Sequence, residues 1–120
     1  MFVDDEESIV ESCREMLQTL GYDVVTASGP IRALEIFREH PGDFDLVITD
    51  YTMPHMNGFD LAGEIMRLRP GVPVMLCTGF SETMSLEKAR AAGIKAFVMK
   101  PFSRLEIGRA IRKALAPDTA

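Results

Sequence analysis

The chain has 120 residues, of which 47% are apolar and 26% are charged, and its formal net charge is −5 at pH 7. These proportions are typical of a globular protein, and the length suits one domain whose core needs no disulfide or structural zinc. The negative charge argues against a broad nucleic-acid footprint, and no apolar run approaches the length of a membrane span. Because we find no secretory signal, we expect a cytoplasmic protein.

Strand-like and helix-like segments alternate from the first residues onward. The apolar run at 1–3 predicts a strand, and apolar residues at three- and four-residue spacing predict a helix over 6–20. A short β-branched run at 23–27 predicts the second strand, and the helix at 30–40 begins with a proline in its first turn. Since only three apolar residues precede Asp4, the first strand is either shortened or part of a chain excised from something longer.

The rest of the chain continues the alternation. Further strands are predicted at 46–50, 74–78 and 96–100, and further helices at 59–69, 83–92 and 103–115. The strands are continuous apolar runs, which is typical of a parallel sheet covered by helices on both faces. The sequence therefore predicts an α/β fold, a doubly wound five-stranded parallel sheet over residues 1–116, with 117–120 as a tail or the start of a linker.

Three aspartates stand where two of these strands end. Asp4 and Asp5 follow the first strand, and Asp50 ends the third. In a parallel sheet the carboxyl ends of the strands line one crevice, so we expect the three carboxylates to meet there. Like charges at that distance repel unless a cation joins them or some of them protonate, and oxygen ligands suit Mg2+. A carboxylate beside that metal could accept a phosphoryl group.

The segments around these aspartates resemble the receiver domain of two-component signalling proteins, and the resemblance covers essentially the whole chain. The matching segments are Val3-Asp4-Asp5-Glu6, Thr49-Asp50-Tyr51-Thr52-Met53-Pro54, Met56-Asn57-Gly58, Cys77-Thr78-Gly79 and Lys100-Pro101-Phe102. Each segment alone is a weak signal, but their order and their positions at strand ends make the combination specific. The resemblance implies the flavodoxin-like receiver fold.

The resemblance also implies a role for each acidic residue. Asp50 is the expected phosphoacceptor. Asp5, Asp50 and the backbone carbonyl of Thr52 are the expected direct ligands of Mg2+, and Asp4 is expected to bind the ion through water or to position it. The ion would neutralise the crevice and hold the phosphoryl oxygens.

Three further residues have roles implied by the resemblance. Lys100 would pair with Asp50 or with a phosphoryl oxygen, and a cis Lys100-Pro101 bond would direct it into the crevice. Thr78 would donate its hydroxyl to the phosphoryl group, and Phe97 occupies the position of the aromatic switch. Because Phe97 lacks the hydroxyl of a tyrosine, this switch would depend less on a hydrogen bond.

The leading interpretation is a phosphoryl-accepting signalling switch that takes its phosphoryl group from a histidine kinase or a histidine phosphotransfer protein. Thr78 and Phe97 would transmit the change to the surface of the last helices and the fifth strand, where a homodimer could form. We expect no direct contact with nucleic acid or membrane. A plausible kinase-docking surface is the exposed face of the first helix, with Glu11, Arg14, Glu15 and Gln18.

Two other functions compete with this interpretation. A docking or dimerisation module that works without phosphorylation would be expected to have lost at least one of the acids, the hydroxyl or the lysine. A Mg2+-dependent phosphatase would need a second acid or base beside the acceptor, and the residue two positions after Asp50 is Thr52. The parent protein is left open as a stand-alone regulator, a transcription factor or a hybrid histidine kinase.

The two cysteines, Cys13 and Cys77, lie inside apolar patterns and far apart in sequence. They are interpreted as small buried thiols, with a disulfide or a metal pair as the lesser alternative. His40 and His55 have no cysteine or second histidine at metal-ligand spacing, so no zinc site is assigned.

Overall fold

The computed structural model describes residues 1–79 and 86–116 and contains the predicted five-stranded parallel sheet. The strands lie in the order β2-β1-β3-β4-β5, and every neighbouring pair is parallel. Their bounds are β1 (Phe2–Val3), β2 (Thr26–Ala27), β3 (Val47–Asp50), β4 (Val74–Thr78) and β5 (Ala96–Met99). The described helices are α1 (Glu7–Thr19), α2 (Pro30–Glu39), α3 (Gly58–Leu68), α4 (Leu86–Ala91) and α5 (Arg104–Leu115).

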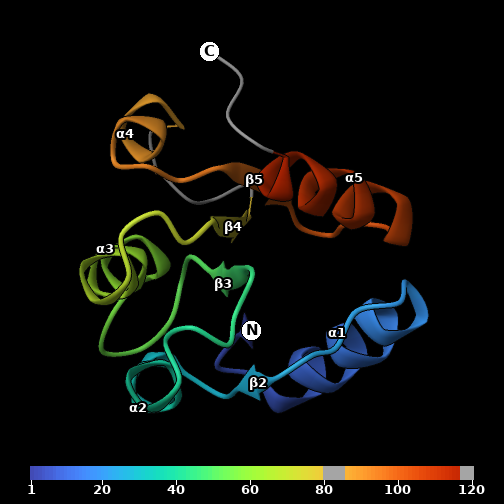
Figure 1. Ribbon diagram of the computed structural model, residues 1–120. Coiled ribbons are helices and arrows are strands. Elements are labelled where there is room, and N and C mark those ends of the chain that lie inside the picture. The colour runs from blue at the N-terminus through green and yellow to red at the C-terminus, as the bar shows by residue number, and fades with distance from the viewer. Residues whose placement is uncertain (80–85, 117–120) are drawn as a thin grey trace.

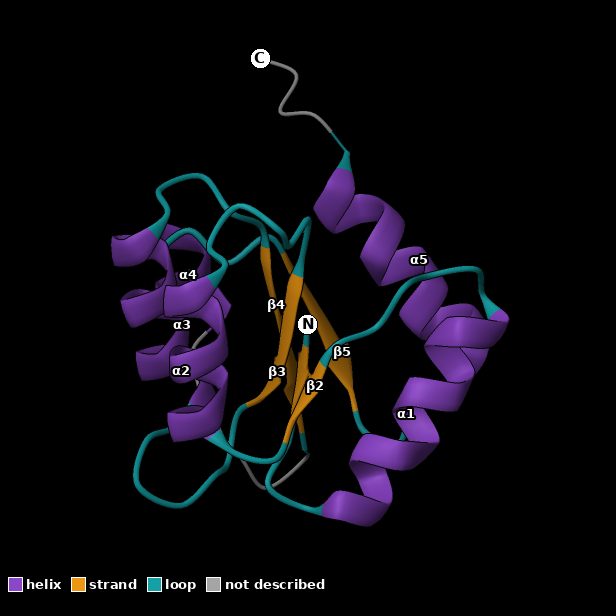
Figure 2. Ribbon diagram, turned by 60° about the horizontal axis from the view of Figure 1, so that its bottom comes forward, coloured by secondary structure: helices purple, strands orange, loops and turns teal. Residues whose placement is uncertain are grey.

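Helices cover both faces of the sheet, which confirms the doubly wound architecture. Figure 1 shows α1 and α5 on one side of the strands and α2, α3 and α4 on the other, and Figure 2 shows the same three layers after rotation. Each face has its own apolar cluster, one containing Phe37, Ile65 and Leu76 and the other containing Met75 and Ile107. The strands are therefore buried on both sides, as their continuous apolar runs predict.

The largest difference from the prediction is in the second strand. The second strand was expected at 23–27 but is only Thr26–Ala27, because it pairs with β1, which begins at Phe2. Val25 still accepts a hydrogen bond from the Phe2 amide at 2.9 Å, and its side chain is 43% exposed. The predicted beginning of the fourth helix at Thr83 lies outside the described residues, as does the tail at 117–120.

Side-chain caps fix the beginnings of two helices near the carboxyl edge of the sheet. The Asn57 side chain accepts the amide of Asp60 at 2.8 Å at the start of α3. At the start of α5, Ser103 and Glu106 form a capping box in which each side chain accepts the other residue's amide. These caps satisfy amides that the first helical turn leaves without partners.

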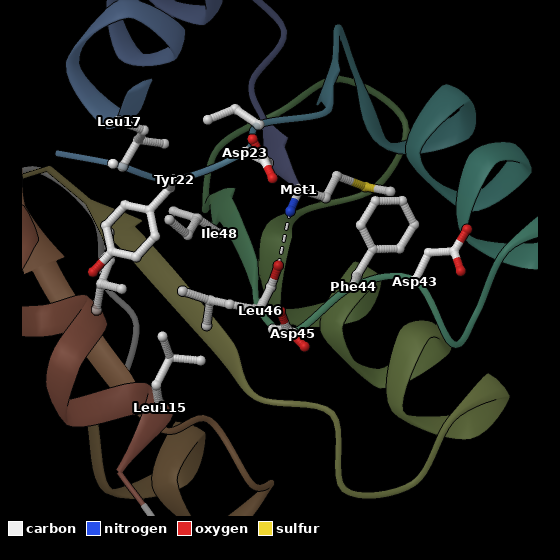
Figure 3. Close-up of a pocket in the computed structure, with 13 residues that line it drawn as sticks. Met1, Leu17, Tyr22, Asp23, Asp43, Phe44, Asp45, Leu46, Ile48 and Leu115 are labelled. Carbon is white, nitrogen blue, oxygen red and sulfur yellow. Dashed lines mark hydrogen bonds between the residues drawn. The ribbon is translucent and has the colours of Figure 1, made fainter. Parts of the chain in front are cut away.

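The opposite, amino-terminal edge of the sheet contains a cavity of about 350 Å3. Figure 3 shows its mixed lining, in which the Tyr22 ring lies near Ile48, the Phe44 ring lies near Asp43, and the Met1 nitrogen donates to the Leu46 carbonyl at 2.8 Å. Asp4 and Asp50 lie at the other, carboxyl edge of the sheet. No helix within the described ranges is both long enough and apolar enough to cross a membrane.

The prediction for the cysteines is confirmed, because Cys13 and Cys77 are both free and buried. Burial raises the pKa of Cys13 to about 11, with a smaller contribution from the negative charge of Asp4. Burial likewise raises the pKa of Cys77, which lies on β4 beside Asp50. Both groups are therefore neutral thiols at physiological pH, and neither has the character of a reactive thiolate.

We expect neither cysteine of the folded protein to react readily with iodoacetamide at pH 7.5, since the thiolate is the nucleophile and both sulfurs are buried. Intact mass should show alkylation of both only after addition of urea. Ser12→Cys, at an exposed neighbouring position, should react quickly and serves as the control. Rapid labelling of either native cysteine would contradict this account.

Above about pH 8.5 the unfolded thiols ionise while the folded ones do not, so the free energy of unfolding should fall as pH rises.

Candidate functional site

The carboxyl edge of the sheet brings together the three aspartates singled out from the sequence. Asp4 follows β1, Asp50 ends β3, and Asp5 lies next to Asp4. Each offers a carboxylate oxygen, and these oxygens all lie within 4.8 Å of one another. Asp4 and Asp50 are 1% and 5% exposed, whereas Asp5 is exposed. The parallel arrangement of β1 and β3 thus produces the predicted acidic crevice.

Lys100 enters this crevice from the end of β5. Its Nζ lies 2.7 Å from Oδ1 of Asp50 and 3.3 Å from Oδ2 of Asp4. Burial by itself would lower the pKa of Lys100, but the interactions with Asp50 and Asp4 outweigh burial and raise this pKa above its ordinary value. Lys100 is therefore an ammonium at neutral pH. The Lys100-Pro101 bond is cis, and the Lys100 amide donates to the Thr78 carbonyl at 2.7 Å.

The two buried aspartates have different local partners. Asp4 accepts the amide of Glu6 on Oδ1 at 3.0 Å and contacts Lys100 through Oδ2. Asp50 has the shorter contact with Lys100, through Oδ1. Asp4 is thus held at both oxygens by groups of the protein, while the neighbouring Asp5 side chain faces solvent. This arrangement suits a positioning role for Asp4 and a more direct contact with a cation for Asp5.

The donor set fits Mg2+. Three carboxylates and one ammonium leave two formal negative charges, which a divalent cation would balance. All of the side-chain donors are carboxylate oxygens, which Mg2+ prefers. In the part of the chain that the structure describes, this is the group of acidic side chains close enough to share one ion.

The loop after Asp50 is packed directly against that residue. Gly58, the first residue of α3, donates its amide to the Tyr51 carbonyl at 2.7 Å. A Cβ atom added to Gly58 would lie 2.2 Å from the carbonyl oxygen of Asp50 and 3.0 Å from a Leu76 methyl group. From the sequence, Gly58 belongs to a matching segment and is expected only to shape the loop after Asp50, so this contact was not predicted. A glycine at the start of a helix, eight residues after Asp50, is the signal that was available.

The other predicted residues lie around the crevice. Thr78 is the half-buried last residue of β4, and Thr52 is exposed two positions after Asp50. Phe97 is half-buried and packs against the cluster beneath α2, α3 and α4. Leu76 is paired in register with Phe97, so Thr78 and Phe97 project from the same face of neighbouring strands, two residues apart. The structure therefore places the hydroxyl and the ring on one side of the sheet.

Comparisons with known proteins identify the family. The family model described as "Response regulator receiver domain" matches residues 1–112. The chain is 34% identical over 116 residues to a probable transcriptional regulator, ycf27, of Porphyridium aerugineum, and 30% identical over 115 residues to the sensor kinase CckA of Brucella abortus. These matches cover 96% of the chain in both cases, but only 47% of the regulator and 12% of the kinase.

A solved structure gives the same result. The response regulator protein TrrA of Thermotoga maritima, in complex with Mg2+ and BeF, is 35% identical, with a TM-score of 0.82. The match covers 95% of this chain and 96% of that one. The chain belongs to the response regulator receiver domain family of two-component systems. It spans about half the length of the regulator from Porphyridium aerugineum and 12% of the length of the sensor kinase.

Gly58→Ala should displace Asp50 and destabilise the protein, because the new methyl group would overlap the Asp50 carbonyl. We expect the free energy of unfolding to fall by about 1–3 kcal/mol, as for an overpacked core. Urea denaturation measures this change. Gly63→Ala in the same helix meets nothing within 4 Å and should instead stabilise the protein by about 0.5–1 kcal/mol. Equal effects of the two substitutions would show that the contact with Asp50 is unimportant.

Proposed function

We propose that this domain is a phosphoryl-accepting switch in which Asp50 is the acceptor. The observation that supports the proposal most is the convergence of three carboxylates with Lys100, whose Nζ lies 2.7 Å from Asp50 Oδ1. Residues 1–116 would form one receiver domain of a cytoplasmic signalling protein, and 117–120 a tail or linker.

In the proposed reaction, a carboxylate oxygen of Asp50 attacks the phosphorus of a phosphohistidine. The P–N bond breaks, its electron pair stays with the imidazole nitrogen, and an acyl phosphate forms on Asp50. Lys100 is protonated and already next to Asp50, so its ammonium can move from the carboxylate to a phosphoryl oxygen without a proton transfer.

Mg2+ would be held by Asp5, Asp50 and the backbone carbonyl of Thr52, with Asp4 acting through water or by positioning. When bound, the ion would neutralise the crevice and hold the phosphoryl oxygens. Support comes from the all-oxygen donor set and from the related regulator whose structure is a complex with Mg2+ and BeF. Exposure of Asp5 and Thr52 leaves this side of the crevice accessible from solvent.

The donor would be a histidine kinase or a histidine phosphotransfer protein. Similarity to a segment of the sensor kinase CckA supports a place in this class of phosphorelay and is compatible with a parent hybrid kinase. The donor must bring its phosphohistidine to the carboxyl edge of the sheet, next to the beginning of α1. The exposed face of α1, with Glu11 and Glu15, is the surface proposed to dock it.

Thr78 and Phe97 would convert the new phosphoryl group into a change of surface. The Thr78 hydroxyl would bond a phosphoryl oxygen, and the Phe97 ring, on the same face of the sheet, would move into the space that Thr78 leaves. The affected surface includes β5, where Met99 is 49% exposed, and the two last helices. A change in partner or a homodimer at that surface would be the output.

Incubation with acetyl phosphate and Mg2+ should add one phosphoryl group to the chain, as measured by intact mass. Asp50→Asn and removal of Mg2+ with EDTA should each abolish the addition. Asp60→Asn, which removes an exposed carboxylate from the first turn of α3, should leave it unchanged. Absence of any adduct on the folded chain, with a phosphohistidine donor also failing, would favour a docking module that works without phosphorylation.

The switch can be tested with Phe97→Trp, because the chain has no tryptophan of its own. Acetyl phosphate with Mg2+ should change the fluorescence of this single indole, since its environment becomes more buried. Thr78→Ala in the same background should retain Mg2+-dependent phosphorylation but lose most of the fluorescence change. Tyr22→Trp, beside the cavity at the opposite edge of the sheet, is the matched control and should not respond. An unchanged Phe97→Trp signal on a phosphorylated protein would rule out the aromatic switch.

A further inference from the structure

The cavity at the amino-terminal edge of the sheet has an apolar part that several elements build together. Its volume of about 350 Å3 lies within the range of small-ligand pockets in proteins. The apolar wall comes from α1 with Leu17, from β3 with Ile48, and from α5 with Ile111 and Leu115. Figure 3 shows Leu17, Tyr22, Ile48 and Leu115 on one side of Met1. Leu115 is still 41% exposed, so this wall is not covered by the chain itself.

Two carboxylates border the remaining part of the cavity. Asp23 lies in the segment before β2 and Asp45 in the segment before β3, and these strands flank β1 on opposite sides. Figure 3 accordingly shows Asp23 above and Asp45 below the Met1 nitrogen. Both residues are exposed, and among residues 1–79 and 86–116 neither pairs with a basic side chain. Their negative charges therefore remain available to another molecule.

The nitrogen of Met1 does not compensate these charges at neutral pH. It donates to the Leu46 carbonyl and forms no ion pair with either carboxylate. Burial lowers the pKa of this amine to about 6, and the negative charge of Asp45 offsets the effect of burial only in part. The amine is therefore mostly neutral at pH 7.5. The cavity thus combines an uncharged apolar wall with two uncompensated carboxylates.

We propose that this cavity binds a small organic ammonium ion with an apolar body, such as an arylalkylamine. The apolar body would lie against Tyr22 and Leu115, where it removes apolar surface from water. The ammonium would lie between Asp23 and Asp45, where charge-assisted hydrogen bonds to carboxylates are the strong kind. This inference does not depend on phosphorylation of Asp50, which lies at the opposite edge of the sheet.

The lining disfavours the other classes of small ligand. An anion would meet carboxylates and no lysine or arginine side chain. A metal ion needs several oxygen ligands at one point, and within the described ranges the three acidic side chains close enough to share an ion are Asp4, Asp5 and Asp50, at the other edge. A neutral apolar molecule would leave both carboxylates of the cavity without a counter-charge. The organic cation is the class that satisfies both parts of the cavity.

A ligand in this cavity would connect elements that otherwise meet only at their ends. Leu17 is near the end of α1, Ile48 is in the sheet, and Leu115 is the last residue of α5. The ligand would therefore hold the end of α5 against the sheet. Because it binds the folded chain and not the unfolded one, it should also raise the free energy of unfolding with its concentration.

Three probes of similar shape separate the charge from the apolar body. In protein NMR titrations at pH 7.5, 2-phenylethylamine should bind with a Kd of about 0.1–10 mM, as expected for a ligand of this size. 2-Phenylethanol, with a hydroxyl in place of the ammonium, should bind at least about tenfold more weakly, and 3-phenylpropionate should not bind. The shifted amides should include those of Tyr22, Asp45 and Leu115. Added salt should weaken the binding of the amine but not that of the alcohol.

Substitutions in the two parts of the cavity should have different effects. Asp23→Asn with Asp45→Asn should weaken the binding of 2-phenylethylamine at least about tenfold and leave that of 2-phenylethanol unchanged. Leu115→Trp, which fills the apolar part with an indole, should weaken the binding of both. Glu87→Gln removes an exposed carboxylate from α4 and is the matched control that should change neither. Circular dichroism would show that each variant is folded.

Three results would each overturn the proposal. The first is no binding of 2-phenylethylamine up to about 50 mM, well above the expected Kd. The second is equal binding of the amine and the alcohol, which would show that the carboxylates take no part. The third is a set of shifts confined to the amides around Asp4 and Asp50, which would assign the amine to the acidic crevice instead.

Discussion

The structure depends on how the repulsion among three carboxylates at the carboxyl edge of the sheet is offset. Two carboxylates at 4.8 Å repel by about 3–4 kcal/mol at an effective dielectric constant of about 20, and Asp4, Asp5 and Asp50 form three such pairs. Lys100 offsets part of this repulsion by contacting both buried carboxylates. The remaining negative charge would favour a bound cation and, with the proposed cation, a phosphoryl group.

The fold makes this arrangement possible because the charged groups come from different strands. β1 and β3 are neighbours, so their ends bring Asp4 and Asp50 together, while Lys100 arrives from β5, on the far side of β4. The Lys100 amide is held by the Thr78 carbonyl at the end of β4. The close approach of Gly58 to the Asp50 carbonyl packs the beginning of α3 directly against the end of β3. A shift of any of these strands would therefore change the distances between the carboxylates and the ammonium of Lys100.

The sequence predicted the layers and the acidic crevice but not all of the contacts. Alternation of apolar runs and helical periodicity is a local signal, and strand ends of a parallel sheet meet at one edge, so the convergence of Asp4 and Asp50 followed from pattern alone. The extent of β2 depends on how much of β1 lies beside it, which no local pattern contains. The close approach of Gly58 to Asp50 and the two ion pairs of Lys100 depend on how distant segments pack in three dimensions. A local sequence pattern does not contain that information. The resemblance supplied the lysine's role, but not its distances to the two carboxylates.

β5 contributes side chains to both faces of the sheet. Its residues alternate, so Phe97 packs beneath α2, α3 and α4, while Ala96 and Val98 belong to the cluster beneath α1 and α5. A ring that rotates at Phe97 changes one face directly and reaches the other only through the backbone of β5. The surface proposed to change includes Met99 and the two last helices and therefore spans both sides of β5. The ring of Phe97 would act on α4 directly, and on α5 only through a shift of the β5 backbone.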